Sequence, residues 1–321
     1  MRKLAIVVPT YNRAATLERT LLSVAGPAGD AVAFARAREQ GAPAVIVVDN
    51  NSCDATPDVV ASFGPAVRYI KEGRQGLSFA RNTGIEAARA LDAELVAFVD
   101  DDMEATPNWA AALVRAFDEQ PHAECIGGRV LPSNADELPP WVTPEHWGPL
   151  ALQDHGPEPL VFDAACPRGL IGANFAFRRR IFDCLGEFSP DVQRVKDGIG
   201  STEDHEMVQR LYDAGGRAAY VPNVVVTTQV PPERMTYDYH RRWHLGHGRF
   251  TARMRNPEAE QTPRGRVLGV PAHLFRDALS DSVRWVKLSA TRDRTHAFQA
   301  ETRLWFFSGF FKERCECALR R

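Results

Sequence analysis

The chain of 321 residues has a formal net charge of −2, and 44% of its residues are hydrophobic. This composition is ordinary for a globular protein of one large or two average domains, and it argues against a general nucleic-acid-binding protein. The six cysteines are scattered, the N-terminal apolar run is too short for a signal peptide, and no stretch reaches the ~18 apolar residues that span a bilayer.

The first part of the chain alternates strand and helix patterns. Apolar, β-branched runs predict strands over residues 4–8, 44–48, 67–70 and 95–99. Helical spacing or capping signals predict helices over 14–24, from 56 onward, over 76–91 and from 106 to 117. This alternation is typical of βαβ units and predicts an α/β fold with a mainly parallel sheet.

The pattern breaks over residues 131–167, which are rich in proline, tryptophan and acidic residues. Strand-like residues return at 170–177, and 201–214 read as an amphipathic helix with Thr202 at its N-cap. Residues 217–230 predict two short strands around Pro222 and Asn223, and we expect no strand beyond Pro232.

The C-terminal part reads as helical, which suggests a second region with a different character. Helical patterns cover residues 234–255, 267–290 and 294–318, with many arginines and aromatic residues. We therefore predict a nucleotide-binding and catalytic domain over 1–230 and a helical C-terminal region over 231–321.

Three consecutive carboxylates, Asp100, Asp101 and Asp102, follow the strand predicted over 95–99. Adjacent carboxylates repel one another and are costly to bury without a partner. A hard divalent cation removes that cost, and the carboxyl ends of strands are where open α/β sheets bind ligands. The segment therefore predicts a metal and phosphate site, and a solvated acidic turn is the alternative.

Polar segments also follow the other predicted strands, at residues 9–12, 49–52 and 73–82. In a parallel sheet these segments meet at the same edge. Together they offer an aromatic ring, carboxylates, amides and a guanidinium group. A nucleoside diphosphate needs this set, because it has a base to stack, a ribose to hydrogen-bond and a pyrophosphate to neutralise.

Five segments in this order make the chain resemble the family 2 inverting glycosyltransferases, which have the GT-A fold. They are residues 6–13, 47–54, 76–84, 98–102 and 201–206. The resemblance covers about residues 3–230 and leaves the C-terminal helices outside it. It implies a metal-dependent enzyme of the hexosyltransferase type that moves a sugar from a nucleotide-diphospho-sugar, with uridine diphosphate as the first choice. The expected setting is polysaccharide or glycoconjugate biosynthesis.

The resemblance also implies roles for particular residues. Those expected to line the nucleotide are Pro9, Thr10, Tyr11 and Asn12, with Tyr11 near the base. Asp49 would contact the base, and Arg81 would face the phosphates or the ribose. Of the three carboxylates, Asp100 would lie near the ribose and the metal, Asp101 would lie in the donor site, and Asp102 would bind Mg²⁺ or Mn²⁺.

Asp204 matches the general base of the family, and Glu203 would orient it or bind the acceptor. The chemistry agrees, since transfer requires a base that accepts the proton of the attacking hydroxyl group. A helix N-terminus favours the ionised carboxylate that such a base needs. Without the resemblance, Thr202, Glu203 and Asp204 would read as ordinary helix capping.

The chain departs from the family at two places. Some members have a metal-binding histidine in the region that corresponds to residues 226–230, where this chain has none. His240, His244 or His247 can substitute only if the fold brings them there. Tyr239 occupies the glutamine position of the motif found in processive synthases, which argues against a polysaccharide-secreting synthase.

The basic stretch 240–255 and the aromatic cluster 304–311 allow several roles. They can pack on the catalytic domain, bind a phosphate-bearing acceptor such as a lipid-linked glycan, contact an anionic membrane or form a homodimer. We expect a cytoplasmic protein, either free or peripheral on the inner face of the membrane, with a sugar or a lipid-linked glycan as acceptor and no nucleic-acid partner.

Two other functions fit parts of the pattern. A sugar-phosphate nucleotidyltransferase also combines an α/β nucleotide site with metal-binding carboxylates, but it usually has a glycine-rich loop after its first strand, where this chain has Thr10, Tyr11 and Asn12. A non-catalytic nucleotide- or glycan-binding relative is the other alternative, and the intact Asp102 and Asp204 argue against it.

Overall fold

A computed structural model describes residues 3–25, 43–195, 198–254 and 265–319. The chain divides into two compact units. The first unit combines Met1–Ser133, Leu152–Pro190 and Glu203–Gln229, and the second combines Asn134–Ala151, Asp191–Thr202 and Val230–Arg321. The predicted domain boundary at residue 230 stays a prediction.

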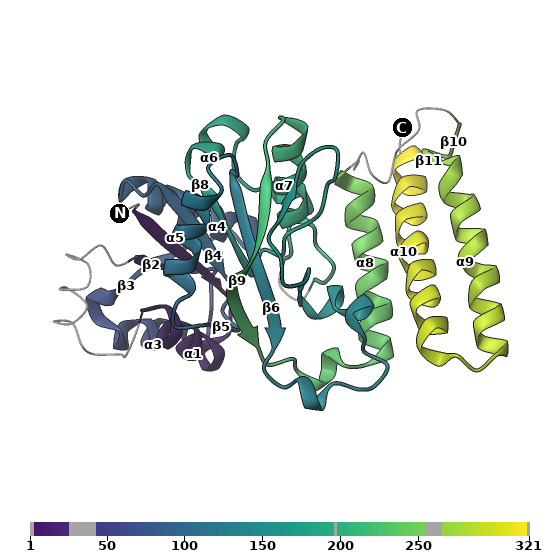
Figure 1. Ribbon diagram of the computed structural model, residues 1–321, viewed down its shortest axis with the longest axis horizontal. Coiled ribbons are helices and arrows are strands. Elements are labelled where there is room, and N and C mark those ends of the chain that lie inside the picture. The colour runs from purple at the N-terminus through teal and green to yellow at the C-terminus, as the bar shows by residue number, and fades with distance from the viewer. Residues whose placement is uncertain (1–2, 26–42, 196–197, 255–264, 320–321) are drawn as a thin grey trace. The chain divides into compact units, whose positions relative to one another are not determined.

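The first unit is built on a sheet whose parallel half contains the four predicted strands (Figure 1). These are β1 (Leu4–Thr10), β2 (Ala44–Asp49), β3 (Val67–Lys71) and β4 (Leu95–Val99), in the order β3-β2-β1-β4. Every residue of β1, β2 and β4 is buried. Both faces of a parallel sheet are covered, so strands of this kind are apolar at nearly every position, as the sequence runs indicate.

The described residues of this unit form six helices, and they include the helices predicted from the N-terminal pattern. They are α1 (Ala14–Ala25), α3 (Thr56–Ser62), α4 (Leu77–Ala90), α5 (Trp109–Glu119), α6 (Arg180–Leu185) and α7 (Glu203–Asp213). Helix α4 packs on β1 and β2. A Cβ atom at Gly84 would lie 2.3 Å from Cγ1 of Val7, so this glycine lets α4 approach β1 closely.

The other half of the sheet is mixed. β8 (Asn174–Arg178) runs antiparallel to both of its neighbours, β4 and β6 (Cys125–Pro132). β9 (Ala218–Thr228) is parallel to β6, whereas β5 (Met103–Ala105) and β7 (Leu160–Phe162) are antiparallel to β9. The sheet therefore continues beyond the parallel half, and the predicted α/β class is confirmed.

The prediction of two strands over residues 217–230 is wrong, because β9 is one continuous strand. Its register with β6 shifts between Gly127 and Arg129, opposite Pro222. A proline donates no ladder hydrogen bond and is tolerated at such an irregularity. Gly128 makes the shift possible, since a Cβ atom there would lie 1.8 Å from the carbonyl oxygen of Val224.

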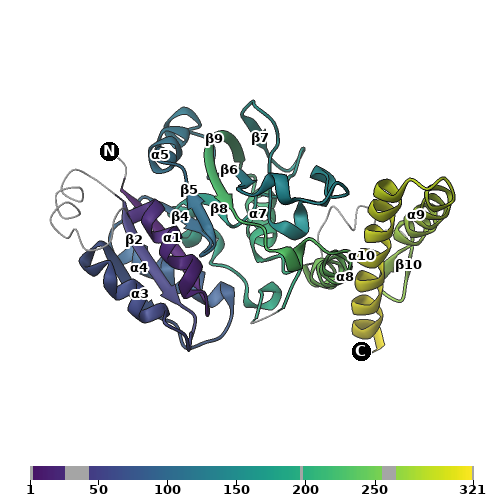
Figure 2. The same cartoon turned by 90° about the horizontal axis from the view of Figure 1, so that it is seen from below.

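In the second unit, three long helices lie side by side with α10 in the middle (Figures 1 and 2). They are α8 (Tyr237–Met254), α9 (Ala272–Ala290) and α10 (Arg294–Leu319). Along the described parts of the chain, no helix is both long and apolar enough to cross a bilayer. Contrary to the sequence prediction, a two-stranded ribbon, β10 (Arg266–Val267) and β11 (Val270–Pro271), precedes α9.

Two glycines allow α8 and α10 to come into backbone contact. A Cβ atom at Gly248 would lie 2.0 Å from the carbonyl oxygen of Phe306, and one at Gly309 would lie 2.0 Å from that of Leu245. Phe307 and Phe310 of the predicted aromatic cluster are buried in the core of this unit.

Arginines of α8 are paired with acidic residues of α10. Arg241 Nε lies 2.6 Å from Glu301 Oε1, and the Nε atoms of Arg249 and Arg253 lie 3.0 and 2.8 Å from the carboxylate of Glu313. Much of the positive charge that suggested a phosphate or membrane site on residues 240–255 is thus neutralised within the unit.

Candidate active site

The parallel order β2-β1-β4 brings three polar segments to the carboxyl edge of the sheet, as the sequence predicts. The segment after β1 carries Asn12, whose backbone amide donates to Ser52 Oγ at 2.9 Å. In return, Asn12 Oδ1 accepts from the backbone amide of Cys53 at 2.8 Å. Asn12 and Asn51 both have positive φ, 52° and 72°. Asparagine tolerates this conformation better than most residues, which lets both loops turn sharply.

Asp49, at the end of β2, is 1% exposed and has both carboxylate oxygens engaged. Oδ1 accepts from the amide of Ser52 at 2.7 Å, and Oδ2 accepts from the hydroxyl of Tyr69 at 2.6 Å. Burial and this hydrogen bond raise the pKa of Tyr69 to about 12. Tyr69 was missed by sequence reasoning, because a tyrosine in a predicted strand carries no local signal for such a contact.

A second missed group, Glu72, organises the loop that leads from β3 to α4. It accepts hydrogen bonds from Arg74 and from the hydroxyl of Thr83, and those from Arg74 lower its pKa to about 2. Asn50 fixes the same loop, with Oδ1 accepting from the amide of Gly76 at 2.7 Å. The polar stretch 73–82 is therefore tied to the end of β2.

The three carboxylates after β4 lie in different environments. Asp102 Oδ2 lies 2.9 Å from Arg13 Nη1, and Asp100 Oδ1 lies 3.5 Å from Arg81 Nη2. Asp101 is buried, and its burial together with the nearby Asp102 raises its pKa to about 7. Repulsion within this set is therefore relieved by two arginines and by a weakened charge on the middle residue.

These carboxylates fit a divalent cation that takes part of its ligands from the substrate. No three His, Cys, Asp or Glu side chains among the described residues are grouped so that they can hold a metal by themselves. Mg²⁺ is commonly bound by one or two carboxylates while substrate phosphates supply further ligands. The outer carboxylates, Asp100 and Asp102, have the chemistry for that mode.

The predicted phosphate ligand Arg81 is 1% exposed and points toward carboxylates. Its Nη1 atom lies 3.1 Å from Glu203 Oε1, in addition to the contact with Asp100. The guanidinium carbon also lies 5.3 to 6.0 Å from three ring centroids, those of Phe98, Phe175 and Phe188. Arg81 thus bridges the end of β4 and the first turn of α7, and its contact with the donor stays a prediction.

Asp204 lies beside this bridge. Its Oδ2 atom accepts from the amide of Gly172 at 2.9 Å, and its Oδ1 atom accepts from the amide of His205 at 2.8 Å. A Cβ atom at Gly172 would lie 2.5 Å from Arg81 Nη2 and 3.1 Å from Asp204 Cβ. Gly172 therefore lets one backbone segment touch both side chains.

The remaining predicted residues divide into two groups. Pro9 and Thr10 are buried at the end of β1, and Tyr11 is half-buried. The histidines considered as metal ligands lie on α8 in the second unit, where the aromatic rings of Trp141, Tyr239 and Phe298 lie near His240. Trp141 stacks on Tyr237 with centroids 4.4 Å apart, so it packs within that unit.

The family model described as glycosyl transferase family 2 matches residues 5–186, which is more than half of the chain. The chain belongs to this family. It is 25% identical over 198 residues to the glucosyl-dolichyl phosphate glucuronosyltransferase of Haloferax volcanii, and the alignment covers 61% of each protein. The chain thus spans about three fifths of the length of that relative.

Solved structures show the same GT-A fold. The mannosyltransferase PcManGT of Pyrobaculum calidifontis, in complex with GDP-Man and Mn²⁺, aligns with a TM-score of 0.60 and 19% identity over 98% of this chain and 87% of that one. Residues 1–349 of S. aureus TarS, in complex with UDP-GlcNAc, align with a TM-score of 0.52 and 15% identity over 99% and 92%.

Proposed function

We propose that this family 2 protein transfers a sugar from a nucleotide-diphospho-sugar to an acceptor hydroxyl group, with inversion at the anomeric carbon and with Mg²⁺ or Mn²⁺ bound. The observation that carries this proposal is the continuous contact from Asp100 through Arg81 to Glu203, which is followed by Asp204 in the first turn of α7. Transfer needs counter-charge at the leaving diphosphate and a base at the acceptor, and this contact joins candidates for both tasks.

Asp100 and Asp102 would hold the cation, and Asp49, Tyr11 and Asn12 would line the nucleotide. When bound, the cation stabilises the negative charge that builds on the leaving diphosphate. The Mn²⁺ in the mannosyltransferase complex supports this choice. Uridine is our first choice of base, although the two solved neighbours contain GDP-Man and UDP-GlcNAc.

Asp204 would accept the proton of the acceptor hydroxyl as its oxygen attacks the anomeric carbon. A bond forms between that oxygen and the anomeric carbon while the bond to the diphosphate oxygen breaks. Single displacement inverts the anomeric centre. Hydrogen bonds from the amides of Gly172 and His205 would hold the carboxylate in place, and Arg81 would fix the neighbouring Glu203.

We propose a sugar or a lipid-linked glycan as the acceptor. The relative from Haloferax volcanii bears the name of an enzyme that acts on a glucosyl-dolichyl phosphate, which supports the lipid-linked choice. The 131–167 segment begins in the last two residues of β6 and is a candidate for acceptor selection, because loops of this kind set specificity on a common fold.

The test begins with calorimetry of UDP, GDP, CDP and dTDP, each with Mn²⁺ and with EDTA. One diphosphate should bind tightly in a metal-dependent manner, and Asp102→Ala should lose that dependence. Asp204→Asn should keep donor binding but slow transfer by at least about a hundred-fold, the usual contribution of a general base. Asp213→Asn, at the other end of α7, is the matched control. Binding without turnover in the wild-type protein under any acceptor would favour a non-catalytic relative.

A further inference from the structure

Helix α9 exposes an apolar stripe that the core of its own unit does not use. Leu279, Val283 and Val286 are all exposed, and Leu279 and Val286 reach 67% and 58%. Their spacing of three or four residues places them on one face of the helix. The opposite face packs on α10 through Leu274, which is buried in the core of this unit.

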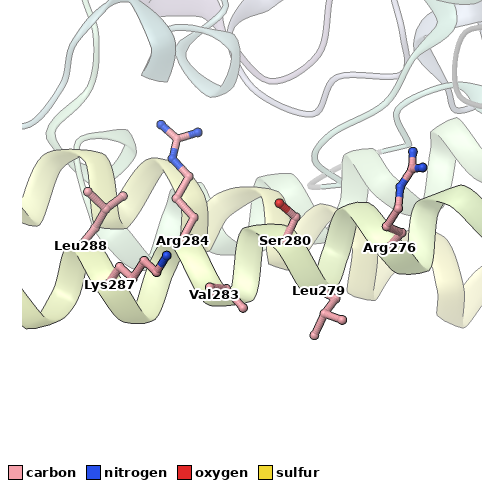
Figure 3. A pocket seen from close by; sticks show the side chains of 7 residues that line it. All are labelled: Arg276, Leu279, Ser280, Val283, Arg284, Lys287 and Leu288. Carbon is pink, nitrogen blue, oxygen red and sulfur yellow. The ribbon is translucent and has the colours of Figure 1, made fainter.

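Positive charge lies along one side of this stripe. Arg276, Arg284 and Lys287 line the same shallow depression as Leu279 and Val283, which has a volume of about 640 Å³. In Figure 3, Arg276 and Arg284 extend from one edge of the helix, whereas Leu279 extends from the opposite edge. The outward face of α9 is therefore apolar on one side and cationic on the other.

The acidic residues of α9 do not cancel this charge. The helix contains only Asp277 and Asp281. Asp281 is buried and lies 2.7 Å from Arg303 of α10, so it belongs to the inner face. Asp277 Oδ1 lies 3.5 Å from Arg276 Nε, and Arg284 and Lys287 remain as excess positive charge on the outward face. This contrasts with α8, whose arginines are paired with acids of α10.

We propose that α9 is a membrane-docking helix that lies along the surface of a bilayer containing anionic lipids. A helix with exposed apolar side chains and adjacent cations binds at the headgroup boundary, with the apolar groups inserted and the cations near lipid phosphates. A second copy of this chain fits the outward face of α9 less well than a membrane does. An isologous contact places the same patch on both subunits and brings like charges together.

This proposal concerns where the protein binds and does not depend on its transfer activity. It would bring the second unit to the surface that presents lipid-linked acceptors, if such acceptors are used. The ribbon before α9 also exposes Val267 and Leu268 at its turn, which adds apolar groups at the N-terminal end of the helix.

Sedimentation of the full chain with vesicles tests the proposal. Binding should be strong to phosphatidylcholine vesicles that contain phosphatidylglycerol, weak to pure phosphatidylcholine, and reduced by salt. Each cation near an anionic surface contributes about a five-fold gain in affinity, so Arg276→Gln, Arg284→Gln and Lys287→Gln together should weaken binding by about a hundred-fold. Leu279→Asn combined with Val283→Asn should also weaken it at least ten-fold, through lost apolar insertion.

Two controls distinguish the effect of the α9 substitutions on vesicle binding from the effect of changing charge or exposed apolar residues elsewhere in the protein. Arg68, Arg115 and Arg217 are exposed arginines of the first unit, and their joint change to Gln alters the net charge equally. Val161→Asn alters an exposed valine of that unit. Both controls should bind vesicles as the wild type does. The proposal is overturned if controls and α9 variants lose binding alike, if no anionic vesicle binds, or if Leu279→Asn instead abolishes a dimer in light scattering.

Discussion

Arg81→Met tests the buried network that joins the end of β4 to the start of α7. Arg81 is 1% exposed and lies 3.1 Å from Glu203 and 3.5 Å from Asp100. Methionine fills a similar volume among the three phenylalanine rings but carries no charge. The substitution therefore removes the partner of two carboxylates while it keeps much of the apolar packing.

Removal of one partner from a buried ion pair costs about 3–5 kcal/mol, because the other charge stays buried without compensation. We expect a loss of this size in the free energy of unfolding. That is a large part of the ~5–15 kcal/mol of a typical protein. At ~2–4 °C per kcal/mol for a domain of this size, the midpoint of thermal unfolding should fall by roughly 10 °C.

Urea denaturation measures the loss as a change in the midpoint at constant slope. The double variant Arg81→Met with Glu203→Gln should be more stable than Arg81→Met alone, because it also removes one of the stranded charges. The control is Arg180→Met, which breaks a surface pair with Glu124 and should cost less than ~1 kcal/mol. A loss in the free energy of unfolding no larger for Arg81→Met than for this control would contradict the role of the buried pair.

Three further predictions concern other parts of the protein. Gly309→Ala would place a Cβ atom 2.0 Å from the carbonyl oxygen of Leu245. It should destabilise the second unit by at least ~1–3 kcal/mol, which a lower urea midpoint would show. Unchanged stability would contradict the close contact between α8 and α10. Burial lowers the pKa of His240 to about 4, below the 6.5 of the unfolded chain. The unfolded state therefore binds more protons between these two pH values. The free energy of unfolding should fall by up to ~3 kcal/mol as the pH drops from 6.5 to 4. His240→Phe should flatten this fall in pH-dependent melting, and an unaltered pH profile would exclude His240 as its source. Tyr69→Phe removes the 2.6 Å hydrogen bond to the buried Asp49. It should lower the free energy of unfolding by ~1–3 kcal/mol and weaken nucleotide binding in calorimetry. Wild-type values for both quantities would show that Asp49 needs no such partner.

Features with a local cause could be predicted from the sequence. Apolar runs predict the buried strands, and the polar residues that follow these strands meet at one edge of the sheet because the strands are parallel. Asp49 and Asp100 therefore stand where the sequence predicts. The start of α7 at Glu203 follows from the acidic residues that favour a helix N-terminus.

Features that depend on distant partners could not be predicted. The partner of Arg81 is Glu203, which is 122 positions away in the chain, and no local pattern connects them. The arginines of α8 resemble a free basic surface until the acids of α10 are placed beside them. The ribbon before α9 was missed because its turn uses Leu268 and Gly269, both with positive φ, and leucine is an unusual residue in that conformation.

The reciprocal hydrogen bonds between Asn12, Ser52 and Cys53 bind the loops after β1 and β2 into one piece. Neither loop can open while the other stays closed, because each supplies both a donor and an acceptor to the other. The amide protons of Asn12 and Cys53 should therefore exchange with solvent water at a common rate, as members of one cooperative opening. The edge of the sheet would then meet a ligand as a surface formed in advance, with little ordering left to occur on binding.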